Sequence, residues 1–449
     1  MQYLNHFISD RMLRALKAVG FIIAIILLSI LTKSCNTDSC KVTHTYVYYS
    51  AVETNLTFLR NAVEVVAPRS IESAGRIYFK DDYLFINEPG EGIHVIDNKN
   101  PEVPVHLNFI KIPGNFDLAI RGAILYADSY MDLLSFDISN IQQARLINRE
   151  ENVLQSVNFM GFTVDNNRNL VITYKREERV EITENDCANI LEPWGGRFWG
   201  GGIIMMESFA TAQRGTTLNL MPGRISAGAG IGGSMARFTI VDQYLYMLNG
   251  IGVETASLAN PVKPELLNRL DVGWGIETIF PYEDMLFIGS TTGMHILDIS
   301  NPERPAYVST YAHLFACDPV VVEGNYAYVT LRTGTECRMA NLNVLEVIDI
   351  SNIRNPRLVK DYPMHNPHGL GIDQNILFLC DGDAGLKIFD ASNPLEIDKH
   401  VLARYPNINA YDVIPFGNVL MMIGSNGLYQ YSYADPNNIT QISHINFKN

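Results

Sequence analysis

Along most of this chain, apolar residues occur in short runs of four to six that are separated by turn residues. Residues 367–405 show this clearly, and their apolar runs predict four strands, at 369–372, 376–379, 386–389 and 399–402. The second and third strands are largely apolar on both faces, which is typical of strands in the middle of a sheet packed between neighbours. Beyond the N-terminal segment no stretch has a long helical period, so the pattern predicts an all-β protein.

The end of the third predicted strand carries a tract that recurs along the chain, Ile296-Leu-Asp-Ile-Ser-Asn-Pro302 in its fullest form. Its Asn occurs at positions 100, 140, 260, 301, 352 and 393, so most copies lie about 40 residues apart, a spacing typical of propeller blades. The step from 140 to 260 holds two units and an insertion, because residues 162–164 and 170–173 resemble the first two strands of another unit. We therefore recognise eight units, of which the third is badly degraded and the last ends near the C-terminus at Asp435-Pro436.

Four-stranded units that repeat around a ring predict a single β-propeller, an architecture that leaves few long sheet edges exposed. The degraded third unit leaves the number of four-stranded blades at seven or eight. An open β-solenoid is the main rival, although its coils are usually shorter than 40 residues. The tract itself follows the third strand and is expected to set the turn into the outer strand.

These units, and above all the Ile-Leu-Asp-Ile-Ser-Asn-Pro core, resemble the LVIVD repeat of bacterial surface proteins. The resemblance covers roughly residues 74–447 apart from the insertion, and it is specific as a repeat signature. It implies a propeller-like protein outside the cytoplasm. It implies no reaction.

Residues 1–35 are expected to be a targeting segment. Arg11, Arg14 and Lys17 precede an apolar run over 18–31, which fits a signal sequence and is short for a membrane span. The following Leu31-Thr-Lys-Ser-Cys35 resembles a bacterial lipobox, with its Leu one place too far upstream. We expect a lipid on Cys35, with an uncleaved anchor or simple secretion as alternatives. The protein is thus expected to be extracytoplasmic and held at the outer membrane or cell surface. Residues 36–73 would form a tether and leading segment, and residues 74–449 the propeller, with an insertion at about 184–234.

The cysteines fit an oxidising compartment. Cys317 begins the first strand of its blade and Cys337 lies in the loop after the second strand. Because these two strands are antiparallel, both thiols reach the same face, and a disulfide between them is expected. A bond between Cys40 and Cys187 is a weaker hypothesis, and Cys380 is expected to be a buried free thiol.

Composition excludes some partners. With a net charge of −14, the protein is a poor match for nucleic acid and for anionic membrane surfaces. A hydrophobic content of 47% in 449 residues allows a large core, and the repeats favour one domain.

Ionisable residues recur where the first strand of each blade begins, on the face that we call the mouth face. The loop that joins the second and third strands of each blade lies on the same face. These loops contain Asp128, Asp132 and Asp381. A polar ring at this level predicts a binding site for a ligand, or for a divalent cation held by oxygen atoms. The alternative is a structural role, in which the carboxylates satisfy backbone groups and the arginines pair with them. The predicted ring consists of Arg76, Asp117, Arg237, Glu277, Asp318, His368 and Asp412.

The insertion is the second candidate site. Trp194 and Trp199 lie in a glycine-rich sequence and could stack on a glycan or contact a protein partner, or else cap the core. The run Gly228–Gly233 lacks the spacing and the strand–turn–helix context of a nucleotide site. We also expect Asp381-Gly-Asp-Ala-Gly385 to be a tight turn with a positive φ at Gly382 or Gly385, and the pair His365 and His368 to be structural.

The sequence thus predicts a membrane-anchored, cell-surface binding or scaffolding module that is not an enzyme, with an unknown protein or glycan ligand. The alternative is a metal-dependent hydrolase, similar to propeller lactonases, with Glu277, Asp318, His368 and Asp412 around an axial ion. Fold alone does not separate these functions.

Overall fold

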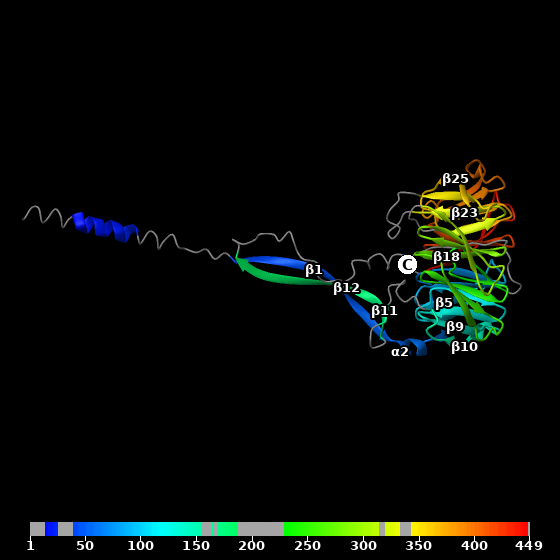
Figure 1. Ribbon diagram of the computed structural model, residues 1–449, viewed down its shortest axis with the longest axis horizontal. Helices are drawn as coiled ribbons and strands as arrows, with labels where there is room; N and C mark the ends of the chain where they lie inside the picture. The colour runs from blue at the N-terminus through cyan, green and yellow to red at the C-terminus, as the bar shows by residue number, and fades with distance from the viewer. Residues whose placement is uncertain are drawn as a thin grey trace, which may run out of the picture. The chain divides into compact units, whose positions relative to one another are not determined.

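The computed structural model describes residues 14–25, 39–154, 163–164, 169–186, 229–313, 319–332 and 343–447. Its main body is a ring of seven antiparallel sheets, each of which contributes four strands as one blade (Figure 1). The prediction of a β-propeller with seven or eight four-stranded blades is therefore confirmed, with seven. In residues 367–405 the strands are β26 (Leu370–Asp373), β27 (Ile376–Cys380), β28 (Leu386–Asp390) and β29 (Val401–Tyr405), close to the predicted ranges.

Each blade uses four strands that are consecutive in its sheet. Blade 1 contains β3 (Ile77–Lys80), β4 (Tyr83–Glu88), β5 (Gly92–Asp97) and β6 (Val105–Lys111), and blade 2 contains β7 (Leu118–Arg121), β8 (Ile124–Ser129), β9 (Asp132–Asp137) and β10 (Arg145–Glu150). Blade 3 contains β14 (Phe238–Val241), β15 (Tyr244–Asn249), β16 (Gly252–Ser257) and β17 (Glu265–Asp271), and blade 4 contains β18 (Ile276–Tyr282), β19 (Met285–Ser290), β20 (Gly293–Asp298) and β21 (Ala306–Ala312). Blade 5 contains β22 (Val320–Glu323), β23 (Tyr326–Leu331), β24 (Val344–Asp349) and β25 (Arg357–Pro363), blade 6 contains β26 to β29, and blade 7 contains β30 (Ala410–Phe416), β31 (Val419–Gly424), β32 (Gly427–Ser432) and β33 (Thr440–Asn446). Short 3₁₀ turns, η1 (Ile141–Gln143) and η4 (Ile397–Lys399), precede the outer strands of blades 2 and 6.

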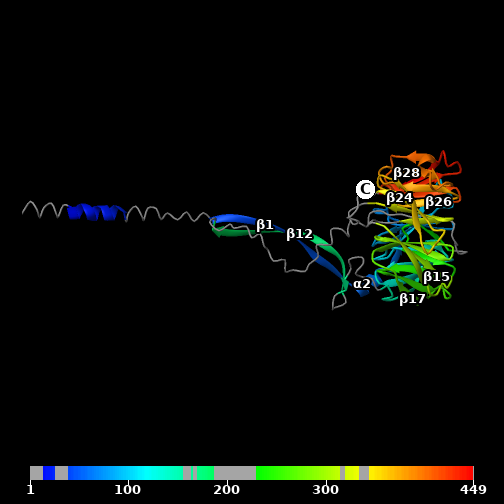
Figure 2. The ribbon, with the colours of Figure 1, turned by 45° about the horizontal axis from the view of Figure 1, so that its top comes forward.

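The expected third unit is not a blade. Of its residues, β11 (Thr163–Val164) and β12 (Asn169–Asp186) form a separate three-stranded sheet with β1 (Ser39–Asn55), in the order β1-β12-β11. Figure 2 shows β1 and β12 side by side. β12 has 18 residues, about three times the length of a blade strand, and polar residues dominate its second half, so it offers no apolar faces to pack between two blades.

The chain divides into two compact units, 1–50 with 174–202 and 51–173 with 203–449. In the first unit, residues 14–25 are helical, and a hydrogen bond joins Ser50 Oγ to Glu177 Oε1 at 3.2 Å. The described part of the chain contains no helix with the length and apolarity that a membrane crossing requires.

In the second unit, α2 (Leu56–Asn61) follows β1, and β2 (Glu64–Val66) adds a strand outside β6. A further short strand, β13 (Ile231–Gly232), pairs with the inner edge of β3. Blade 1 is thus part of a six-stranded sheet with the order β13-β3-β4-β5-β6-β2.

The recurring tract forms the turn into the outer strand, as expected. Its Asp accepts a hydrogen bond from the backbone N–H two residues later, as in Asp298 with Ser300, Asp349 with Ser351 and Asp390 with Ser392. Its Asn does the same with the residue two places on, as in Asn260 with Val262. Both are turns in which a side chain replaces a backbone acceptor.

The tract also joins neighbouring blades. At six of the seven joints, a side chain of one blade donates a hydrogen bond to the carbonyl of the residue that follows the tract Asn in the next blade. The pairs are Gln430 with Pro101, Asn108 with Ile141, Tyr126 with Pro261, Tyr246 with Pro302, Ser309 with Ile353 and Tyr362 with Pro394. At the seventh joint, Tyr405 donates to Ile439.

The ring closes between blades 7 and 1 by side-chain contacts, because no blade combines strands from both ends of the chain. Asn98 and Gln430 exchange two amide hydrogen bonds, of 2.9 and 2.7 Å. The rings of Phe79 and Phe416 lie 5.0 Å apart.

Candidate functional site

The first strands start, and the second strands end, on one face of the ring, as the pairing of Ile77 with Ile86 in blade 1 requires. This is the mouth face, and the tract lies on the opposite face. Six of the seven predicted ring residues are described, and each lies at or just before the start of a first strand, from β3 to β30. The seventh, Asp318, lies outside the described residues.

In blades 1 and 2, the predicted ring residues bind the protein's own backbone. Arg76 donates from Nε to the carbonyl of Met235 at 2.5 Å and from Nη1 to that of Phe116 at 2.6 Å. Asp117 Oδ2 accepts hydrogen bonds from the backbone N–H groups of Arg237 and Phe238. Arg76 Nε lies 3.9 Å from Asp117 Oδ2. This part of the ring therefore fits the structural alternative.

Burial controls the charges in this half of the ring. It raises the pKa of Asp117 above its ordinary value, although Arg76 and the N–H of Arg237 oppose the shift. It also raises the pKa of Asp128 to about 6, against hydrogen bonds from the N–H groups of Asp117 and Phe116. Burial, together with the nearby charge of Arg76, lowers the pKa of Arg237 to about 10.

The Met235 carbonyl that Arg76 binds lies in a segment that begins in the glycine-rich end of the insertion. Ala229 bridges to Arg121 at the end of β7, and Ile231 and Gly232 pair with Phe79 and Tyr78 in β3. Residues 229–236 therefore run along the inner edge of blade 1, from the tract face to the mouth face. We call them the inner segment.

The glycines of the inner segment are required by Tyr78. A Cβ on Gly230 would overlap the Tyr78 ring, and one on Gly232 would lie 2.7 Å from it. The Tyr78 hydroxyl donates to the carbonyl of Gly230 at 3.1 Å and accepts from the N–H of Ile120 at 3.3 Å. Gly230 and Gly232 thus allow close packing against Tyr78.

The other half of the ring, in blades 4 to 7, contains Glu277, His368 and Asp412, together with Arg332 next to the end of β23. We call these four residues the polar half-ring. Burial raises the pKa of Glu277, opposed by Arg332, and it raises the pKa of Asp412 well above its ordinary value. Burial and the charge of Arg332 lower the pKa of His368 to about 3, so this imidazole is neutral at physiological pH.

His368 is held on several sides. Its Nε2 lies 3.2 Å from Asn366 Nδ2, its ring packs 5.2 Å from the ring of Tyr411, and its carbonyl accepts from Thr330 Oγ1. Its Nδ1 is buried and has no hydrogen-bond partner within the part of the chain that the structure describes. A buried polar atom without a partner is costly, and this one marks the polar half-ring as a place for a ligand.

Arg332 does not belong to the ring that the sequence predicted. Its position at the end of a second strand on the mouth face was the available signal. Its charge acts on both Glu277 of blade 4 and His368 of blade 6.

The tight turn and the free thiol expected near His368 are both observed. His365 pairs with Asp383 at 3.0 Å, and no contact joins it to His368 among the described residues. Gly382 and Gly385 both have positive φ, 58° and 86°, in the predicted tight turn. Cys380 is buried as a free thiol, and burial raises its pKa.

Among the residues described, no group of three or more His, Cys, Asp or Glu side chains could hold a metal ion. Arg332 adds a third guanidinium to the predicted ring, beside those of Arg76 and Arg237. The remaining predicted site residues, Cys35, Trp194, Trp199, Cys317 and Cys337, lie outside the described residues.

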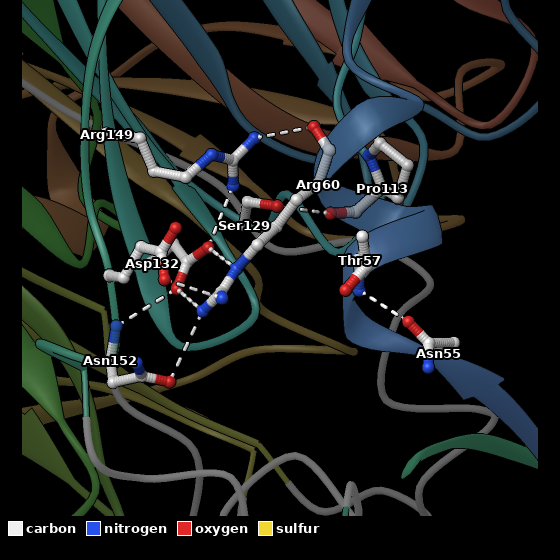
Figure 3. Close-up of polar contacts among 9 residues, drawn as sticks. Asn55, Thr57, Arg60, Pro113, Ser129, Asp132, Arg149 and Asn152 are labelled. Carbon is white, nitrogen blue, oxygen red and sulfur yellow. Dashed lines mark hydrogen bonds and ion pairs between the residues drawn. The ribbon is translucent and has the colours of Figure 1, made fainter. Parts of the chain in front are cut away.

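A second polar cluster lies on the mouth face of blade 2, around the carboxylate of Asp132 (Figure 3). Arg60 of α2 binds both oxygens of Asp132, at 2.8 and 2.9 Å, and Arg149 binds Oδ2 at 2.8 Å. The backbone N–H of Asn152 donates to Oδ1 at 3.0 Å. Asp132 therefore fastens both segments that lead away from the blade, one toward β1 and one toward β11.

Sequence comparisons match the LVIVD repeat at residues 279–313 and 316–363, which are blades 4 and 5. A search of curated proteins gives no match. Similar solved structures include the computationally designed Ika8 protein, with 8% identity over 85% of this chain and 89% of that chain and a TM-score of 0.47. Others are a functionally unknown protein from Desulfotomaculum acetoxidans, with 10% identity, 82% and 99% coverage and a TM-score of 0.47, and Kluyveromyces lactis Hsv2p, with 10% identity, 83% and 99% coverage and a TM-score of 0.46.

Proposed function

Because this chain is a β-propeller built from LVIVD repeats, we propose that it is a non-enzymatic binding module whose ligand occupies the mouth face at the polar half-ring. The buried Nδ1 of His368, without a partner among the described residues, is the observation that carries the proposal. The half-ring adds a guanidinium and two carboxyl groups, which favours a ligand with several hydrogen-bonding groups.

Binding fits the titration of these groups better than catalysis. A general base works best when its pKa lies near the working pH. The pKa of His368 at about 3 makes the imidazole a weak base. The pKa of Asp412 lies well above its ordinary value, which favours a protonated carboxyl that donates a hydrogen bond.

The test is a thermal-shift screen of sugars, amino acids, organic anions and divalent cations against wild type, Glu277→Gln and His368→Gln. A ligand of the half-ring raises the Tm of wild type, since binding to the folded state alone adds stability, and raises that of the variants much less. Asp298→Asn is the matched control, because this carboxylate lies on the tract face. A compound that shifts all four proteins equally, or a screen without any shift, would refute the proposal.

The cation arm of the screen addresses the alternative, a metal-dependent hydrolase centred on Glu277, Asp318, His368 and Asp412. A bound divalent ion that a chelator removes, with a loss of Tm, would support that enzyme. Arg332 argues against it, because its positive charge acts on Glu277 and His368.

We further propose that Cys35 carries a lipid and that the protein is anchored outside the cytoplasm, at the outer membrane or cell surface, where its partner is a protein or glycan. The basic residues and apolar run before Cys35 support this. Mass spectrometry of the mature N-terminus tests it, and an intact Met1 or an unmodified Cys35 would refute the lipid.

We also propose the disulfide between Cys317 and Cys337. Mass spectrometry of the same sample, digested without reductant, tests it.

A further inference from the structure

One tryptophan on the mouth face is unusually exposed. Trp274 lies between β17 and β18, three residues before Glu277, and 81% of it is accessible, the largest fraction among the exposed large apolar residues described. Apolar surface of this size is costly to leave in water. Its exposure therefore calls for an explanation.

The loop that carries Trp274 is well held, so local fraying does not explain the exposure. The N–H groups of Val272 and Gly273 both donate to the carbonyl of Ile251, at 2.8 and 3.1 Å, and the N–H of Thr291 donates to that of Gly275 at 2.9 Å. Gly275 has a φ of 70°, and a Cβ there would overlap Thr291. With glycine on both sides, no neighbouring side chain in the sequence covers the indole.

The surroundings of this loop are polar. Arg269 donates to Asp271 at 2.8 Å and to Glu254 at 3.0 Å, which fixes its guanidinium. A Cβ on Gly252, next to Ile251, would lie 2.7 Å from Asp271 Oδ1, so the ion pair lies beside the residue that holds the Trp274 loop. Asp271 remains 61% exposed on its side chain.

A buried histidine adds a second, independent observation. His295 is 8% exposed, and its Nε2 has no hydrogen-bond partner among the described residues. This nitrogen would lie 3.4 Å from a Cβ on Gly273, so it sits directly behind the loop. Its Nδ1 is already used, at 2.6 Å from Thr310 Oγ1.

We propose that this loop is a saccharide-binding site, in which Trp274 stacks on the face of a sugar ring and the Arg269–Asp271 pair binds its hydroxyls. This rests on the proposed function, because it names the ligand class of the mouth face. A tryptophan that binds a protein partner normally lies at the centre of an interface from which water is excluded. Here the loop that carries the exposed indole lies next to an ion pair, Arg269 with Asp271. That combination fits the apolar faces and polar rim of a sugar.

The experiment uses the full chain with Trp194→Phe and Trp199→Phe, which leaves Trp274 as its single tryptophan. Cello-, chito-, xylo- and malto-oligosaccharides and peptidoglycan glycan fragments are printed as an array and then titrated by tryptophan fluorescence. We expect a blue shift with at least one of these sugars. By isothermal titration calorimetry, which needs no tryptophan signal, Trp274→Ala should weaken binding at least tenfold, and Trp274→Tyr should weaken it less because tyrosine retains an aromatic face.

Phe58→Ala is the matched control, since this exposed aromatic lies on α2, away from the loop. The saccharide proposal is overturned if no sugar shifts the fluorescence, or if Trp274→Ala binds as well as the parent. A thermal shift by a compound other than a sugar, lost in His368→Gln, would then leave the proposed function standing and refute only the saccharide. If no sugar on the array binds but a protein ligand is found, the proposed function likewise stands and the saccharide proposal is refuted.

Discussion

At the residue scale, the Asp of the repeated tract has a structural task that its charge explains. The hydroxyl and N–H of Ser300 lower the pKa of Asp298, and the equivalent serines do so for Asp349 and Asp390. The carboxylate is therefore the form that the turn stabilises. Local sequence predicts this turn because Asp and Asn side chains reach a backbone N–H two residues on.

Glycine at position 230 is a second case in which one residue decides a local structure. Gly230→Ala places a Cβ into the Tyr78 ring, so we expect the free energy of unfolding to fall by about 1–3 kcal/mol. Scanning fluorimetry of Tm and urea unfolding measure it. Gly273→Ala is the control, because its Cβ would lie 3.4 Å from His295, an ordinary contact. Equal stability of the two variants would show that the inner segment does not pack against Tyr78.

Acid sensitivity should follow from His368. Its pKa is about 3 in the folded protein and about 6.5 in the unfolded chain, so the unfolded state binds the proton first as the pH falls. Stability is therefore retained above about pH 6.5 and is lost between about pH 6.5 and 3, by up to about 1.4 kcal/mol per pH unit. We expect His368→Gln to flatten this dependence in Tm measurements between pH 7 and 4.

Glu88 lowers stability further in acid, in a different range. Burial alone would raise its pKa, but hydrogen bonds from His94 and from the N–H groups of Glu72 and Ser73 lower it to about 2. The unfolded carboxyl again binds its proton first, and the stability is lost between about pH 4.5 and 2. A His368→Gln variant with an unchanged slope above pH 4.5 would contradict the assignment to His368.

At the scale of elements, sequence predicted the blade strands well and the connecting elements poorly. The blade strands have apolar runs and turn residues at their ends, which are local signals. β1 and β12 are long strands outside the ring, and the polar residues of β12 interrupt the apolar pattern, so the sequence suggested a structureless tether and a degraded blade. The inner segment was missed because its pairing with β3 joins residues about 150 positions apart.

The ion pairs of Asp132 with Arg60 and Arg149, which we call the clamp, allow a test of how α2 is held. Asp132 is nearly fully buried and binds Arg60 and Arg149, so Asp132→Ala leaves two guanidinium groups without their carboxylate. We expect a loss of about 3 kcal/mol and faster tryptic cleavage after Arg60. Arg145→Ala is the control, because its exposed pair with Asp137 contributes at most about 1 kcal/mol. Cleavage at the parent rate would show that α2 does not depend on this clamp.

At the scale of the whole molecule, the ring of ionisable residues could be predicted but its division could not. Placing the repeats in register put the described members on one face, as observed. Nothing in the register shows that Arg76 binds the carbonyl of Met235 or that Asp117 binds the N–H groups at the start of blade 3. Those contacts depend on where a distant segment returns to the ring, and local periodicity carries no information about that.

Ring closure also belongs to the whole molecule. Blades 3 and 4 are consecutive in the chain and are also joined by the hydrogen bond from Tyr246 to Pro302. Blades 7 and 1 are the last and first blades along the chain, and non-covalent contacts hold them together. Gln430 donates to Asn98 and Pro101 and accepts from Asn98 across this closure, and it also donates to Ser443 within blade 7. Gln430→Leu should therefore cost more than a single joint.

We expect Gln430→Leu to lower the free energy of unfolding by about 2–3 kcal/mol, because it leaves the buried amide of Asn98 without its partner. Tyr246→Phe, which removes one hydrogen bond at a chain-linked joint, should cost about 1 kcal/mol. Hydrogen exchange should separate the two further: opening at the closure exposes β3 and β33 early in Gln430→Leu, while Tyr246→Phe leaves their protection unchanged. Equal losses of stability and protection in the two variants would contradict this expectation. The closure between blades 7 and 1 would then be no weaker than a joint between consecutive blades.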